Sequence, residues 1–121
     1  MAFIADAVFD SGLSYAQTNG TRLDICSAEP TTYAAATSTN TLGNATVTTG
    51  APENGAIDGR RVQVGAITAG SVTGTGTATH WALTDGAGVL VATGALTSSQ
   101  AVTSGNTFTL DAISITLRDA A

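Results

Sequence analysis

The residues best suited to catalysis are few in this chain. His80 is the sole histidine and Cys26 the sole cysteine. A histidine acting as a general base needs an orienting acid and a nucleophile within reach, and no Gly-x-Ser-x-Gly or Cys-His pairing accompanies His80. Cys26 has no second cysteine for an internal disulfide and no companion metal ligands. Its place after an apolar stretch predicts a buried small side chain.

Paired carboxylates make no stronger case for catalysis. The candidates are Asp6 with Asp10, one helical turn apart, Asp24 with Glu29 at the end of a strand, and Asp119 near the C-terminus. A glycosidase needs two carboxyl groups at a defined separation in a cleft, which these spacings do not indicate. We expect the carboxylates to be solvated or to cap elements. The sequence therefore predicts a protein that is not an enzyme, with no catalytic residue, cofactor or metal.

Charge is scarce in the composition. Charged residues make up 11% of the chain, against about 25% in ordinary soluble domains. Thr, Ala, Ser and Gly take their place, which suits a protein that packs against neighbours without desolvating many charges. The net charge is −5, and there is no lysine. The sole arginine pair, Arg60-Arg61, points to opposite faces of a strand, so we expect no binding to nucleic acid or to an anionic membrane.

Targeting and membrane segments are not expected either. The first residues, Met-Ala-Phe-Ile-Ala-Asp, have no basic region and no long apolar run, which argues against a signal peptide. The longest uncharged stretches are interrupted by Thr, Ser and Gly, which argues against a membrane span. We therefore expect the protein to be made in a cytoplasm and to stay soluble there.

The elements expected to position these residues form one domain, 1–121, with an N-terminal helix within 1–18 and a β domain over 21–119. The helix is predicted from a row containing Val8 and Tyr15 and a neighbouring row containing Leu13, together the stripe of a helix packed by one face. Strands are expected at 21–27, 41–49, 60–66, 72–83, 89–93, 100–102 and around 108–117; a short helical turn at 31–36; turns at 69–70, 85–88 and 104–106; and a loop at 50–55.

The alternation of side chains gives a more detailed prediction. Trp81 and Leu83 share one face of their strand, which makes Trp81 a core or interface anchor, while Ala78 and His80 share the other. In the last strand the apolar parity slips at 111–112, which indicates a bulge or a crossing between two sheets. The predicted fold is mainly β: an antiparallel β-sandwich or flattened barrel with one N-terminal helix.

Four segments resemble a family of small structural proteins of tailed-bacteriophage particles. They are residues 23–33 (LDICSAEPTTY), 59–64 (GRRVQV), 76–83 (GTATHWAL) and 99–110 (SQAVTSGNTFTL). With the N-terminal helix, the similarity extends over almost the whole chain. The resemblance implies a virion protein and provides no catalytic residues for this sequence.

The first functional hypothesis is a head decoration, or cement, protein. Such a protein binds the outside of the major capsid shell and stabilises it, and the resemblance implies a homo-trimer on the capsid surface of the virion. The residues expected to contact partners are Phe3, Pro52, Glu53, Asn54, Arg60 and Arg61. The alternative is a tail or fibre-associated module that binds a host receptor or glycan through Tyr15, Tyr33 or Trp81.

Overall fold

A computed structural model describes residues 6–55 and 59–117 of the chain. Phe3 and the other predicted helical residues before Asp6 lie outside the described residues, as do residues 118 and 119 of the predicted β domain. The described part is mainly β, with a curled antiparallel sheet in the form of a half-barrel, a second small sheet and an N-terminal helix. The predicted fold class is therefore confirmed.

The elements follow one another as helix α1 and strands β1 to β9, with a single turn of π-helix, η1, between β1 and β2. Their bounds are α1 Asp6–Asn19, β1 Arg22–Cys26, η1 Ala35–Thr39, β2 Thr41–Thr46, β3 Glu53–Asn54, β4 Arg60–Val64, β5 Ile67–Val72, β6 Gly76–Thr84, β7 Leu90–Val102, β8 Thr107–Leu110 and β9 Ile113–Leu117.

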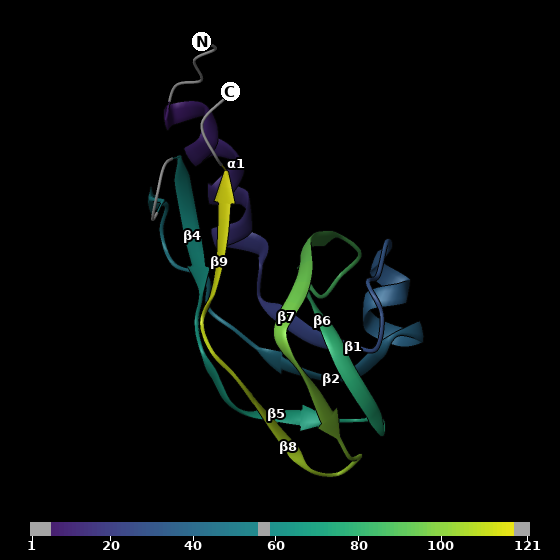
Figure 1. The fold of residues 1–121 in the computed structure, drawn as a ribbon. Coiled ribbons are helices and arrows are strands. Elements are labelled where there is room, and N and C mark those ends of the chain that lie inside the picture. The colour runs from purple at the N-terminus through teal and green to yellow at the C-terminus, as the bar shows by residue number, and fades with distance from the viewer. Residues whose placement is uncertain (1–5, 56–58, 118–121) are drawn as a thin grey trace.

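Two sheets make up the molecule (Figure 1). The larger has the strand order β7-β6-β1-β2-β5-β8 and curls so that its two edge strands, β7 and β8, approach each other. The smaller has the order β3-β4-β9 and carries α1. We call the smaller sheet with α1 the arm.

A long bent ribbon joins the two sheets. Strands β4 and β5 follow each other along the chain and pair with β9 and β8, so that Val64 lies opposite Ile113 and Ile67 opposite Leu110. The chain passes from the smaller sheet to the larger at residues 65–66, between β4 and β5, and returns at residues 111–112, between β8 and β9. Of the two predicted explanations for the parity slip at 111–112, a bulge or a crossing between sheets, the structure shows the crossing.

Two glycines in the larger sheet lie beneath aromatic rings. Phe108 is paired with Gly70, and a Cβ added to Gly70 would lie 2.3 Å from that ring. Trp81 is paired with Gly94, where an added Cβ would lie 2.7 Å from the indole. An aromatic side chain can cover a cross-strand glycine in this way because no Cβ stands between them. The predicted turn at 69–70 was wrong, since Gly70 is an interior residue of β5.

The main core lies on one face of the curled sheet. Leu23, Ile25, Trp81 and Leu83 are buried there, so the shared face of Trp81 and Leu83 is as predicted. Ala78 belongs to the same core, contrary to the predicted alternation. The pairing of β6 with β7 shifts between positions 78 and 80, which disturbs the two-residue period at this point.

Helix α1 covers the small sheet by one stripe. Leu13 and Ala16 are buried against Val62 of β4. The predicted row with Val8 and Tyr15 is not buried, because Val8 is 63% exposed and Tyr15 46% exposed. The helix ends at Asn19, one residue beyond the predicted limit, and the amide of Gly20 just after it donates to the carbonyl of Ala16.

Candidate functional site

The most deeply buried charge of the described residues is Asp24, in the middle of the larger sheet. Its side chain has no exposed surface and accepts two hydrogen bonds from Arg22, at 2.8 and 3.1 Å. The hydroxyl of Thr41 on β2 donates to the same carboxylate at 2.7 Å. The hydrogen bond to Asp24 raises the pKa of Arg22, so the guanidinium stays charged.

The sequence prediction for Asp24 was wrong, because a solvated or capping role was expected. The signal that could have revealed the cluster is the spacing Arg-x-Asp within a strand. Residues two apart point to the same face, so Arg22 can reach Asp24 along β1. The arrangement neutralises a buried charge inside a sheet, and it offers no open position to a substrate.

Cys26 lies on the same face of β1 as Asp24, covered by η1. It is fully buried and packs with Ala36 and Ala82. Its thiol donates to the carbonyl of Ala36 at 3.7 Å. Burial raises the pKa of the Cys26 thiol to about 12, with a further contribution from the Asp24 carboxylate. The prediction of a buried small side chain is confirmed, and the protonated thiol is a poor nucleophile.

The buried thiol should make stability depend on alkaline pH. An unfolded thiol ionises near pH 8.5, whereas the folded one keeps its proton up to a pKa of about 12. At pH values below the pKa of the unfolded thiol, the raised pKa of the folded thiol contributes its full stabilisation. As the pH rises from the unfolded pKa to the folded pKa, this contribution is lost. We expect an additional fall of about 1.4 kcal/mol per pH unit above about pH 9. Urea unfolding of the wild type and Cys26→Ala measures it as the difference between the two pH curves, and parallel curves would contradict it.

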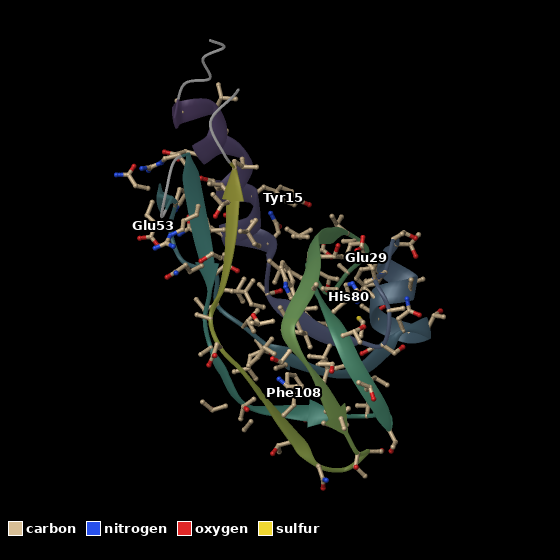
Figure 2. The ribbon with its side chains drawn as sticks, viewed as in Figure 1. Tyr15, Glu29, Glu53, His80 and Phe108 are labelled. Carbon is tan, nitrogen blue, oxygen red and sulfur yellow. The ribbon has the colours of Figure 1, made fainter. Side chains whose placement is uncertain are left out.

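His80 has a local network of its own on the strand β6. Its Nδ1 lies 2.9 Å from the Thr79 hydroxyl, and that hydroxyl donates to the Ser27 carbonyl. Its Nε2 lies 3.8 Å from the Glu29 carboxylate, and Figure 2 shows both side chains beside the π-helical turn. The network holds the imidazole ring between the Thr79 hydroxyl and the Glu29 carboxylate.

The predicted contact residues come together on the β3–β4 hairpin of the arm. Glu53 is paired with Arg61, and Asn54 with Arg60. Arg60 forms a two-pronged ion pair with Asp10 of α1, at 2.8 and 3.3 Å, and donates to the side-chain oxygen of Asn54 at 2.7 Å. The two arginines point to opposite faces, as expected, with Arg60 on the side of the helix.

The outer face of this hairpin is more open. The Nε of Arg61 lies 3.5 Å from the carboxylate of Glu53, whose side chain is 49% exposed. That separation is at the limit for a hydrogen bond, and the buried Nε has no such bond among the described residues. The predicted loop at 50–55 thus contains the short strand β3, and Pro52 leads into it half-buried. Phe3 lies outside the described residues.

A hollow of about 580 Å³ opens between β7 and the β8–β9 corner. Trp81 and Leu96 line it from one side, and Leu110, Asp111 and Ile113 from the other. Trp81 is only 8% exposed, so most of its ring belongs to the core. Of the three aromatic residues in the receptor hypothesis, Tyr15 is the most accessible (Figure 2).

Comparison with family models, with curated proteins and with solved structures finds no match to this chain. Within residues 6–55 and 59–117, no group of three His, Cys, Asp or Glu side chains could hold a metal ion. Over the same residues, no helix has the length and apolar character needed to cross a membrane. The described part of the chain is a mainly β fold in which the polar clusters link the protein's own strands and helices.

Proposed function

We propose that this chain is a structural protein of a tailed-phage particle: a head decoration protein that binds the outside of the major capsid shell. The observation that carries the proposal is the resemblance of the four segments between residues 23 and 110 to small virion proteins. Stabilisation then follows from mass action. A ligand that binds only the assembled shell shifts the equilibrium toward it, by an amount set by its affinity and concentration.

The free sheet edges of the described residues support an assembly role. Strand β7 has 13 residues, none of them charged, and the edge strands β8 and β9 are uncharged as well. Monomeric proteins usually guard such edges with charged side chains or proline, because an unguarded edge pairs with other strands. A chain that functions in a packed shell, as a trimer on the capsid protein, makes use of such edges.

The contact surface we propose on the arm is the β3–β4 hairpin, together with the N-terminal segment that contains Phe3. The guanidinium of Arg60 is already engaged by Asp10, which makes Arg60 a poor reporter of contacts with a partner. Glu53 offers a cleaner test, since its carboxylate is exposed and its one described ion pair is long. Glu53→Lys should weaken binding to undecorated shells by at least about tenfold, because it reverses an exposed charge within the proposed contact surface. Ala87→Lys, in the exposed β6–β7 turn, is the matched control.

Removing residues 1–5 tests the N-terminal segment. Shell occupancy, measured by co-sedimentation, should fall while the circular dichroism spectrum and the unfolding midpoint stay unchanged. Unchanged occupancy would remove that segment from the contact surface.

Copy number in purified virions tests the location. Quantitative mass spectrometry against the major capsid protein should give a ratio near one. A ratio hundreds of times lower would place the protein in the tail, where a receptor-binding role is the alternative. Absence from the particle would contradict both locations.

A further inference from the structure

The chain contains two Asn-Gly dipeptides, Asn19-Gly20 and Asn54-Gly55, whose surroundings differ sharply. In this dipeptide the backbone nitrogen of glycine can attack the side-chain carbonyl carbon of asparagine, because glycine has no Cβ to hinder the approach. The reaction needs a backbone that can bring the two atoms together. The structure therefore decides which of the two sites reacts.

Asn54 lies where the backbone is easily moved. It ends the two-residue strand β3 and is exposed, and the Gly55 amide is held by one bond, to the carbonyl of Gly59 at 2.9 Å. A strand this short, at a sheet edge, opens at little cost in free energy. Its side chain is also activated, because Arg60 donates to the Asn54 oxygen at 2.7 Å.

The guanidinium of Arg60 is fixed by Asp10. Its Nε and Nη2 bond the two carboxylate oxygens of Asp10, at 2.8 and 3.3 Å, which leaves Nη1 directed at Asn54. A cationic donor on a carbonyl oxygen polarises the carbonyl and stabilises the negative charge that develops there during nucleophilic attack. The contact therefore favours reaction at this asparagine.

We propose that Asn54-Gly55 is a self-modification site that converts to aspartate and isoaspartate through a succinimide, with Arg60 stabilising the oxyanion. The Gly55 nitrogen forms a bond to the Asn54 side-chain carbon, and its proton passes to the departing amide nitrogen. The bond from that carbon to Nδ2 breaks and ammonia leaves. Water then opens the ring at either carbonyl, giving a carboxylate beside Arg60.

Asn19-Gly20 is the internal control. The Asn19 side-chain amide donates to the carbonyl of Tyr15 at 3.1 Å, and the Gly20 amide donates to Ala16 at 2.8 Å. Gly20 is buried, and even one added Cβ would lie 2.7 Å from Leu83. Reaction at Asn19 first requires the end of the helix to leave its packing, so the site is protected in the folded state.

The test is an incubation of the purified full chain at mildly alkaline pH, followed by cleavage after arginine and mass spectrometry. The two sites fall in different peptides, 1–22 and 23–60, and fragmentation separates Asn54 from Asn40 and Asn44. We expect Asn54 to convert at least about tenfold faster than Asn19 in the native protein. In urea the two rates should approach each other, because both sites have the same following residue. Equal native rates, faster reaction at Asn19 or no native conversion would each overturn the proposal.

Arg60→Gln tests the activation separately. The glutamine keeps an amide donor but removes the charge, so Asn54 should react about tenfold more slowly in the native variant. Its rate in urea should equal that of the wild type. A native rate equal to or above the wild-type rate would remove Arg60 from the mechanism.

The modification has a consequence for the arm. Conversion takes the formal net charge from −5 to −6 and adds a second carboxylate to the guanidinium that already pairs with Asp10. Isoaspartate also lengthens the backbone at the pairing of β3 with β4. The reaction at Asn54 does not require the protein to be part of a virion.

Discussion

Trp81→Ala is expected to lower the free energy of unfolding by about 3–5 kcal/mol, the usual cost of removing a buried aromatic side chain. Trp81 is 8% exposed and packs in the main core with Leu23, Ile25 and Leu83. Its removal leaves a cavity at the floor of the hollow between β7 and the β8–β9 corner. Urea unfolding followed by circular dichroism measures the change. Tyr15→Ala, on the exposed face of α1, should cost about 1 kcal/mol or less.

A double-mutant cycle with Gly94 tests the explanation. Gly94→Ala alone should cost about 1–3 kcal/mol, because the new methyl group meets the indole. In the Trp81→Ala background the same substitution should cost little or become stabilising, since the methyl group enters the vacated space. Additive effects would mean that the ring and Gly94 are not in contact. The cycle matters for the receptor hypothesis too, because loss of binding in Trp81→Ala is informative only if the fold survives.

Arg22→Ala is expected to lower the free energy of unfolding by about 3 kcal/mol at neutral pH. The substitution leaves the fully buried Asp24 with one hydrogen bond, from Thr41. The value lies at the low end for a buried pair because the Arg22 side chain is 33% exposed and water can enter in its place. The same unfolding experiment measures it.

Two further variants distinguish the effect of leaving buried Asp24 without its partner from the effect of removing any arginine. Arg61→Ala removes an arginine paired at 3.5 Å with an exposed Glu53, so its ion pair should contribute at most about 1 kcal/mol. The double variant Arg22→Met with Asp24→Leu removes both charges of the buried pair and should recover most of the loss. A loss in Arg22→Ala no larger than in Arg61→Ala would contradict this account of Asp24.

The features of the fold that sequence could predict are those set by local chemistry. Asp85 accepts from the amides of residues 87, 88 and 89, and Gly86 has a φ of 74°, so the predicted hairpin turn follows from the residues themselves. These amides lower the pKa of Asp85. The change of face at 111–112 could be predicted because side chains alternate between the two faces of a strand, so a slip in the apolar alternation marks where the faces exchange.

The features that sequence could not predict depend on residues far apart in the chain. Gly70 looks like a turn residue until Phe108, 38 positions later, is placed over it. Asp24 looks like a solvated carboxylate until β2 and β6 enclose it on both sides. The ion pair between Arg60 and Asp10 could not be predicted either, because the two residues are far apart in the chain and no local pattern joins them.

The helix was predicted from its apolar spacing, but the spacing gave one wide stripe of two rows and could not say how much of it packs. Leu13 and Ala16 face Val62 because β4 runs beneath that side of α1. Val8 and Tyr15, in the other row, are left to solvent.

The bent ribbon also determines the order in which the molecule can be completed during synthesis. Helix α1 is synthesised well before its packing partner β4, which begins at Arg60, and β4 lacks its neighbour β9 until residues 113–117 emerge. The larger sheet likewise waits for β8 to close its second edge. Both sheets therefore remain unfinished on the nascent chain until residues 107–117 have emerged, because each sheet pairs segments that are far apart in the sequence, and such a high contact order slows folding.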